Sequence, residues 1–245
     1  MPATWNIQGT AATAQLGDYH IIVDAADPTR GVRWTSTAKN AFQGSTLQFK
    51  PPSSATAPPA LADLYVRGSD LIATYEQLPG AAVQPQLYWR LLEHAELAAI
   101  GVQLLISMQT SLLASEPKCH VESQLPGARI AIWNWKEKTW WGSSQDRKDF
   151  DLRSDPSAGG FVTWFSAPQE ANSYFEVIYP DDRVSQHVLV GRSEACFFAE
   201  PLEKGVIRRG RIAGWLVPNA KIMKTPVEPL QLFLAAQNEP LPLTT

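Results

Sequence analysis

Hydrophobic and polar positions alternate along much of the chain, and this period of two predicts an antiparallel β protein. Segment 91–115 is the ambiguous case, because its Leu, Ala, Glu and Gln content would also support a helix. One face of this segment carries Ile100, Val102, Leu104, Ile106 and Met108, and the other carries Gly101, Gln103, Ser107 and Gln109. Only Leu105 interrupts the alternation. We therefore predict a long strand over this segment.

A second long strand is predicted over 206–217. Arg209, Arg211 and Trp215 share one of its faces, whereas Val206, Ile212 and Leu216 share the other. Long strands of this kind favour a large sandwich over a small barrel.

The clearest hairpin lies within 64–76, where Gly68 and Ser69 separate two strand-like runs. Glycine at the first central position suits a two-residue type II′ turn, which places Arg67 directly opposite Asp70. Further strand-like runs occupy 86–93, 119–125, 161–166 and 173–179. Two more runs, 186–191 and 194–200, flank Arg192 and Ser193 and predict a second hairpin there.

The predicted fold class is therefore all-β, a large antiparallel β-sandwich with at most one or two short helices. One of these helices is placed near 230–236. A sandwich of this kind commonly reaches roughly 200 to 250 residues as one unit, so residues 1–245 are assigned to a single domain. The run PPSSATAPPA at 51–60 favours extended, solvated backbone and is predicted to be a mobile loop within that domain.

Net charge and hydropathy restrict the classes of partner and the cellular location that we expect for this protein. The formal net charge of -3 argues against a basic nucleic-acid surface. The longest apolar stretch, 97–106, is interrupted by Gln103 and is far shorter than the ~20 residues of a membrane helix. The first 17 residues show no secretory signal pattern, so a cytoplasmic location is expected. Cys119 and Cys196 lie in apolar runs typical of buried thiols, although a disulfide between them stays open.

The most informative local feature is a tryptophan window at 133–141, WNWKEKTWW. It contains Trp133, Trp135, Trp140 and Trp141 around a charged turn. Tryptophan rings exposed on a strand face can stack on the apolar face of a sugar ring. The alternative is that they fill a core or cover a sheet edge, because tryptophan is highly buried on average.

Two arginines of the strand predicted over 206–217 are the next candidate ligand-binding residues. Arg209 and Arg211 face the same way as Trp215, so a guanidinium group could bind a pair of hydroxyls or a carboxylate. A solvated sheet face whose arginines pair with glutamates is the alternative.

Catalytic signatures are sparse. The four histidines show no metal-ligand spacing, and we predict neither a metal nor another cofactor. The sequence contains no nucleophile elbow, P-loop or dinucleotide fingerprint. His120 or His187 together with Glu203 are the candidate catalytic residues if the protein is an enzyme.

Two pieces of the chain resemble a known family. The late hairpin at 197–218 and the series of long strands look like the β-supersandwich of galactose-mutarotase-like proteins. Asn172-Ser173-Tyr174-Phe175 resembles the Asn-His-Ser-Tyr-Phe motif of aldose 1-epimerases, aligned through Ser-Tyr-Phe. In that family the His of the motif is the general acid on the ring oxygen and a late carboxylate is the base. In this chain Asn172 stands in place of the His, and Glu203 is the candidate for the late carboxylate.

The resemblance implies a carbohydrate-binding, mutarotase-like module without catalysis, whose ligand is a saccharide or another small polar molecule. An aldose 1-epimerase-type isomerase is the first alternative, and a protein-protein interaction module is the second. The oligomeric state stays open.

Overall fold

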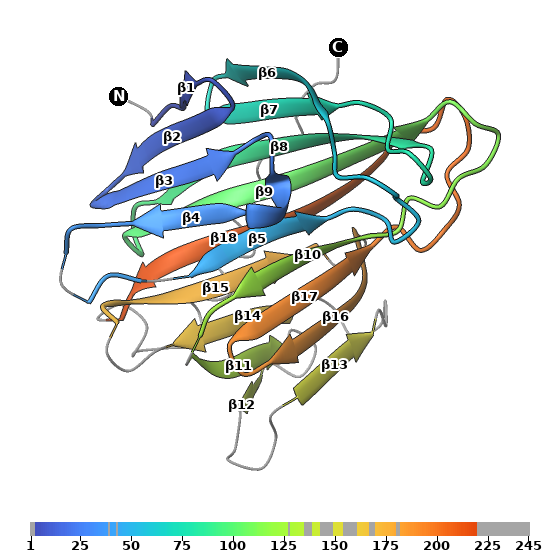
Figure 1. Ribbon diagram of the computed structural model, residues 1–245. Coiled ribbons are helices and arrows are strands. Elements are labelled where there is room, and N and C mark those ends of the chain that lie inside the picture. The colour runs from blue at the N-terminus through green and yellow to red at the C-terminus, as the bar shows by residue number, and fades with distance from the viewer. Residues whose placement is uncertain are drawn as a thin grey trace.

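The computed structural model describes residues 3–38, 40–42, 44–126, 128–134, 139–142, 149–153, 161–166, 170–179 and 182–219. These residues form two nine-stranded sheets (Figure 1). Every strand pairing among them is antiparallel. The predicted all-β, antiparallel sandwich is therefore confirmed.

Neighbouring strands within each sheet are not always consecutive along the chain. In spatial order, sheet A consists of β1 (Asn6–Gln8), β2 (Ala11–Leu16), β3 (Tyr19–Asp24), β4 (Val32–Thr35), β5 (Ser45–Lys50), β10 (Cys119–Gln124), β17 (Arg192–Phe197), β16 (Arg183–Leu189) and β13 (Asp149–Arg153). Sheet B consists of β12 (Thr139–Gly142), β11 (Arg129–Asn134), β14 (Phe161–Ser166), β15 (Asn172–Ile178), β18 (Arg208–Pro218), β9 (Ala99–Thr110), β8 (Val83–His94), β7 (Asp70–Tyr75) and β6 (Leu61–Arg67).

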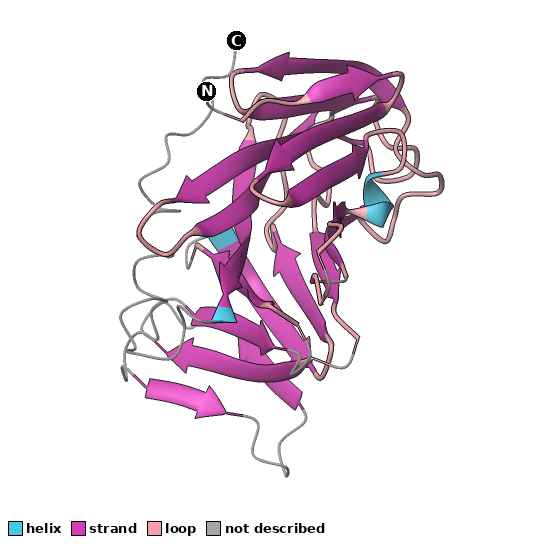
Figure 2. Ribbon diagram, turned by 90° about the vertical axis from the view of Figure 1, so that its left-hand side faces the viewer, coloured by secondary structure: helices cyan, strands magenta, loops and turns pink. Residues whose placement is uncertain are grey.

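The hydrophobic core lies between the two sheets, which Figure 2 shows from the side. Leu47, Phe49 and Val121 enter it from sheet A, and Leu104 and Ile212 enter it from sheet B. We call the faces that meet in this core the inner faces. The opposite surfaces are the outer faces.

The first hairpin follows the prediction, whereas the second long strand covers Arg208–Pro218 instead of 206–217 and leaves Val206 exposed in the preceding connection. Gly68 has φ +62°, and Arg67 pairs with Asp70. On β18, Ile212 belongs to the core between the sheets, whereas Trp215 belongs to a separate apolar cluster on the outer face of sheet B.

The prediction of one strand over 91–115 is wrong in its extent. Strand β8 ends at His94, a turn follows, and β9 begins at Ala99. The turn is closed by a hydrogen bond from Ala98 N–H to the Ala95 carbonyl at 3.1 Å. The sequence does not indicate this turn, because residues 95–98 contain no Gly, Pro, Asn or Asp to mark the chain reversal.

The second hairpin forms, but its turn lies two residues earlier than predicted. Val190 and Gly191 connect β16 to β17, and Gly191 has φ +74°, a conformation that glycine adopts without a steric penalty. Arg192 and Ser193 are already part of β17. The backbone of Gly191 also accepts a hydrogen bond from Leu125 N–H at 2.7 Å, which fixes the turn against a neighbouring segment.

Cys119 and Cys196 are buried, as expected, and both are free thiols. They lie on neighbouring strands, where Cys119 pairs with Phe197 and Cys196 pairs with His120. Side chains one residue out of register point to opposite faces of a sheet, so these two sulfurs do not meet.

The described residues include one short 3-10 helix, η1 (Pro28–Arg30), and no helix among them is long and apolar enough to cross a membrane. The helix predicted near 230–236 lies outside the described residues. Residues 51–60 form irregular backbone, in which Thr56 N–H donates to the Pro79 carbonyl at 2.8 Å.

One carboxyl group lies in the interior between the sheets. Glu176 on β15 is 1% exposed, and the Tyr174 hydroxyl donates to its Oε1 atom at 3.3 Å. Burial is the main cause that raises the pKa of Glu176, and hydrogen bonds from Ser123, Ser193 and Tyr174 oppose the rise. Folding thus shifts this carboxyl toward its protonated form.

Stability should therefore depend on pH through Glu176. The folded-state pKa of Glu176 lies above the ordinary value of 4.5, so protonation of this group contributes fully to folding stability below pH 4.5. This contribution is lost as the pH rises through the folded-state pKa. Glu176→Gln, which cannot ionise, should gain stability relative to the wild type as pH increases. Urea denaturation at a series of pH values measures this difference. Glu93→Gln, at an exposed position, controls for the loss of one carboxylate, and parallel curves for wild type and Glu176→Gln would contradict the prediction.

Candidate functional site

The outer face of sheet B carries side chains in rows that cross several strands. One row is apolar and consists of Leu92, Gly101, Trp215, Phe175 and Trp164, from β8, β9, β18, β15 and β14 respectively. The rings of Trp164 and Phe175 stack with centroids 6.1 Å apart. A Cβ atom at residue 101 would lie 2.8 Å from the Trp215 ring, so glycine is required for this ring to cover β9. This row is closely packed.

A second row of the same face is polar. Thr74, Gln86, Ser107 and Arg209 are cross-strand neighbours on β7, β8, β9 and β18, and Gln84 pairs with Gln109 beside them. Thr74, Gln84, Gln86, Ser107 and Gln109 line a cavity of about 130 Å³, which Ile207 borders. We call this cavity the amide groove.

Hydrogen bonds fix the groups of the amide groove. Gln86 Nε2 donates to Thr74 Oγ1 at 2.9 Å, and Gln109 Nε2 donates to Gln84 Oε1 at 2.6 Å. The Tyr88 hydroxyl donates to Gln86 Oε1 at 2.5 Å. These bonds leave further donor and acceptor positions on the amides and hydroxyls. The groove thus offers uncharged groups that can both donate and accept hydrogen bonds.

Aromatic rings and arginines lie next to the groove. The row beside it contains Tyr65, Ile72 and Tyr88, which are cross-strand neighbours on β6, β7 and β8, and Tyr65 is partly exposed. Burial raises the pKa of the Tyr88 phenol, Tyr65 raises it further, and Arg67 and Arg209 lower it. Arg209 faces Ser107 across the strands. One end of this face therefore combines amides, phenol rings and a guanidinium group.

The arginine face predicted on 206–217 is confirmed in its orientation. Arg211 lies on the outer face of sheet B, where its Nε is 2.9 Å from Asp182 Oδ2 and its guanidinium lies 3.6 Å from the centre of the Tyr179 ring. Arg90 and Asp70, also on this face, form a buried ion pair at 2.6 Å. Both carboxylates of these pairs are thus engaged by arginines.

The tryptophans of the predicted binding window are not an open platform where the structure describes them. Trp133 and Trp215 belong to the same apolar cluster on the outer face of sheet B and are 5% and 1% exposed. Trp135 lies outside the described residues, as do the side chains of Trp140 and Trp141, whose backbone forms part of β12. The structure therefore brings Trp133 and Trp215 together, but in closely packed surroundings.

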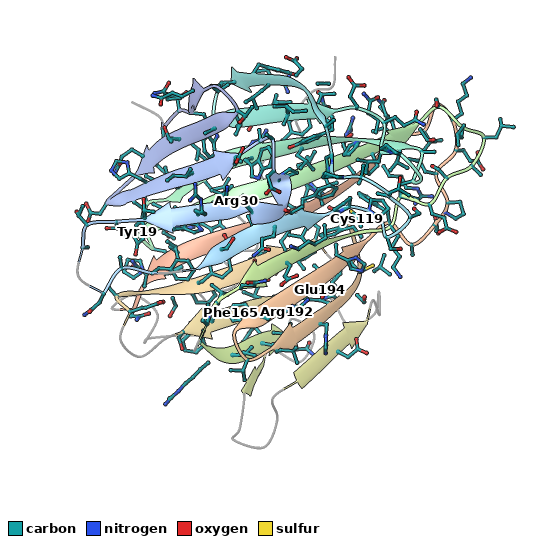
Figure 3. The ribbon with its side chains drawn as sticks, viewed as in Figure 1. Tyr19, Arg30, Cys119, Phe165, Arg192 and Glu194 are labelled. Atoms are coloured by element: carbon teal, nitrogen blue, oxygen red, sulfur yellow. The ribbon has the colours of Figure 1, made fainter. Side chains whose placement is uncertain are left out.

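The candidate acid and base residues lie elsewhere. His187 is the cross-strand neighbour of Glu194 on sheet A, and His120 Nε2 lies 4.0 Å from Glu194 Oε1. Figure 3 shows Glu194 beside Arg192 on the face of sheet A that points away from sheet B. Glu203 is exposed in the connection between β17 and β18. The structure does not place these three side chains on the outer face of sheet B.

Asn172 is the residue that the alignment through Ser-Tyr-Phe sets in place of the aldose 1-epimerase histidine. Its Nδ2 atom donates to the Tyr19 hydroxyl of sheet A at 2.6 Å. It has the same strand parity as Tyr174 and Glu176, which point into the sandwich. In this structure Asn172 therefore links the two sheets.

Sequence reasoning missed the amide groove, although a signal was present. Gln84, Gln86 and Tyr88 occur at every second position, and Ser107 and Gln109 follow on the next strand. The same alternation that predicts a strand also places these polar groups on one face. The sequence did not indicate that β8 and β9 pair in the register that joins the two sets.

Among the described residues, no group of three or more His, Cys, Asp or Glu side chains is arranged to hold a metal ion. The candidate site is therefore built from amides, hydroxyls, phenol rings and guanidinium groups.

Comparison with solved structures identifies the fold. A "putative aldose 1-epimerase" from Klebsiella pneumoniae subsp. pneumoniae is similar over 96% of this chain and 86% of its own, with a TM-score of 0.54 and 9% sequence identity. The fold is the galactose-mutarotase-like β-supersandwich. A "putative kojibiose phosphorylase" from the human microbiome is similar over 96% of this chain but only 36% of its own, with a TM-score of 0.53 and 6% identity. No protein-family model and no curated protein matches the sequence.

The resemblance to galactose-mutarotase-like proteins is thus confirmed at the level of the fold. The late hairpin predicted at 197–218 is wrong, because β17 pairs within sheet A and β18 pairs within sheet B, so this segment crosses from one sheet to the other. In the galactose-mutarotase-like fold of this chain, both the amide groove and the apolar row that contains Trp215 and Trp164 lie on the outer face of sheet B.

Proposed function

We propose that the protein is a carbohydrate-binding module without catalysis, and that it binds a pyranose at the amide groove. The observation that carries this proposal is the set of five uncharged hydrogen-bonding side chains around one cavity on an exposed strand face. Amides and hydroxyls match the mixed donor and acceptor character of sugar hydroxyls. The names of the two structural neighbours, which refer to an aldose and to kojibiose, agree with a sugar ligand.

Stacking on the ring comes from phenol groups in this proposal. Tyr65 is 36% exposed and Tyr88 is bonded to the groove through Gln86, so a sugar held by the amides would have an aromatic face beside it. Arg209 lies on the other side of Ser107 and can bond a pair of hydroxyls with its guanidinium fork. The buried rings of Trp133 and Trp215 belong to one apolar cluster on the same outer face of sheet B.

The absence of catalysis in the proposal follows from the acid and base requirement. Opening a pyranose ring needs a proton donor near the ring oxygen and a base near the anomeric hydroxyl, each within about 3 Å. His120 and His187 lie on sheet A, and Glu203 lies in an exposed connection. A sugar in the amide groove of sheet B would reach neither histidine.

Binding is tested with a glycan screen followed by calorimetric titration of each saccharide that binds. Gln109→Ala, at an exposed position of the groove, should weaken binding by about 3- to 10-fold, the value of one neutral hydrogen bond. Gln124→Ala is the matched control, because Gln124 is also exposed and bonded to a strand neighbour, Glu122, at 2.7 Å, but lies on sheet A. Equal affinities of the two variants, or no saccharide bound at all, would refute the proposal.

An aldose 1-epimerase is the second candidate, favoured by the similarity to the Klebsiella protein. Polarimetry on freshly dissolved α-glucose and α-galactose distinguishes the two. Under the binding-module proposal, mutarotation proceeds at the spontaneous rate. Acceleration that disappears in Glu203→Gln would establish the enzyme instead.

A further inference from the structure

Exposed apolar side chains gather on two connections at one end of sheet B. One connection, 111–114, follows β9, and the other, 203–207, precedes β18. Together they carry four large apolar side chains, each at least 43% exposed: Leu112, Leu113, Val206 and Ile207. Only two other large apolar side chains are exposed in the part of the chain that the structure describes, so these four are not a scatter of single residues. We call the four residues the apolar tip.

The backbone holds the two connections side by side (Figure 1). At one end of the apolar tip, β9 and β18 pair through Met108 and Arg208. At its other end, Ser115 and Leu202 exchange two backbone hydrogen bonds, at 2.9 and 2.8 Å. Leu202 is buried in the core, which anchors the second connection. The four apolar side chains therefore lie between two points of strand pairing, and their exposure does not come from a frayed end.

The apolar tip is continuous with the amide groove. Ile207 belongs to both, because it borders the cavity that Gln109 lines. The first connection is fixed where it leaves β9, since Thr110 Oγ1 donates to the Ala82 carbonyl at 2.7 Å and accepts a bond from Leu112 N–H at 3.2 Å. The groove holds about 130 Å³, whereas pockets for drug-sized ligands span roughly 300–1,000 Å³. A ligand larger than one sugar ring would therefore extend beyond the groove, and at Ile207 it would meet an apolar surface.

The charges of the two connections indicate a neutral occupant. Segment 111–114, Ser-Leu-Leu-Ala, has no charged side chain, and 203–207 has one acid and one base, Glu203 and Lys204. Apolar surfaces that enter an anionic membrane typically have several Lys and Arg beside them, which attract the lipid head groups. A hydrocarbon group attached to the ligand of the groove needs no such attraction, because the sugar already brings it to the apolar tip.

We propose that the saccharide of the amide groove is a glycoside with an apolar aglycone, an alkyl or acyl chain, and that this chain lies on the apolar tip. Contact between them removes apolar surface of both from water, which stabilises the complex in proportion to the area buried. The hydrogen bonds of the groove orient the sugar, and the chain adds affinity. This inference rests on the proposed saccharide function and specifies the class of ligand at the same site.

Calorimetric titration with the methyl, butyl and octyl β-glycosides of glucose, galactose and mannose tests the inference, with each compound below its critical micelle concentration. A fully buried methylene group strengthens binding by about fourfold. A chain on the apolar tip stays partly in water, so we expect the octyl glycoside to bind at least about tenfold more tightly than the methyl glycoside of the same sugar. The butyl glycoside should lie between them.

The outcomes of this series separate the inference from the proposed function. Equal affinities of the methyl and octyl glycosides, or no binding of any glycoside in the series, overturn the inference. The carbohydrate-binding function still stands in either case if a saccharide binds in the glycan screen. If no saccharide binds in that screen, the function and the inference fail together.

Substitutions on the apolar tip provide the second test. Leu112→Ser combined with Leu113→Ser should remove most of the gain from the octyl chain and keep the affinity for the methyl glycoside, because neither residue lines the groove. Val190→Ser is the matched control, since Val190 is 52% exposed in the turn between β16 and β17 of sheet A. It should keep the full gain. A double variant that also keeps the full gain would overturn the inference.

Other occupants of the apolar tip are distinguished by two measurements. Sedimentation velocity should give the same oligomeric state for the wild type and for the double variant. A wild-type dimer that dissociates in the double variant would assign the apolar tip to a second copy of the chain and overturn the inference. Binding of the sugar-free protein to phosphatidylcholine vesicles would assign the apolar tip to a membrane surface and would also overturn it.

Discussion

Replacing Trp215 with alanine should lower the free energy of unfolding by about 3 to 5 kcal/mol, the range for truncating a large buried aromatic side chain. Trp215 is 1% exposed, lies over Gly101 and pairs across the sheet with Phe175. Removal of its ring leaves a cavity in the apolar row, which rigid β-strands close only in part. Urea denaturation followed by circular dichroism gives the change in free energy.

Trp215→Phe is the matched variant, because it keeps an aromatic ring and removes the indole Nε1, a buried donor without a hydrogen-bond partner in the structure. It should lose clearly less stability than Trp215→Ala. If Trp215→Ala instead kept the stability of the wild type and lost affinity for a saccharide, Trp215 would be a stacking platform.

Breaking the ion pair between Asp70 and Arg90 should have a comparable effect. Arg90 Nε and the Asp70 carboxylate are 2.6 Å apart, a second bond joins Arg90 Nη2 to the carboxylate at 2.9 Å, and both residues are buried. Asp70→Asn leaves the guanidinium buried without this carboxylate charge, which is expected to lower stability by about 3 to 5 kcal/mol. Denaturation in urea at neutral pH measures this loss.

The double variant Asp70→Leu with Arg90→Met is the control for this pair. Replacement of both charges by apolar side chains removes the cost of a lone buried charge, so most of the lost stability should return. A double variant as unstable as Asp70→Asn would show that the positions matter for reasons other than their charges.

The ion pair between Asp70 and Arg90 illustrates which contacts the sequence predicts and which it does not. The Gly68-Ser69 turn places β6 and β7 in register, and it is readable because glycine at one position defines the turn type. Arg90 reaches Asp70 through the pairing of β7 with β8, which are separated by a connection of seven residues whose Pro79-Gly80 dipeptide marks a turn but does not fix the strand register. The alternation of side chains along a strand places Arg90 on one face, but the sequence does not indicate which carboxylate Arg90 contacts.

The sequence by itself determined the local features of this protein. Alternation over 100–108 and 206–217 assigned strands and the side to which each residue points, because successive side chains of a strand point to opposite faces whatever lies around them. Together with Ser-Tyr-Phe at 173–175, this pattern suggested the mutarotase-like fold, although the hairpin predicted at 197–218 is a crossover between the two sheets.

Only the tertiary structure decided which of these faces became buried and which groups met. The pairing of β18 with β9 joins residues about a hundred positions apart, and it sets Arg209 beside Ser107 and Trp215 over Gly101. Strand pairing uses backbone hydrogen bonds that all residues share, so local sequence specifies an available edge but not its partner. For the same reason, the amide groove, the apolar tip and the burial of Trp215 depend on long-range register, which alternation along a single strand does not encode.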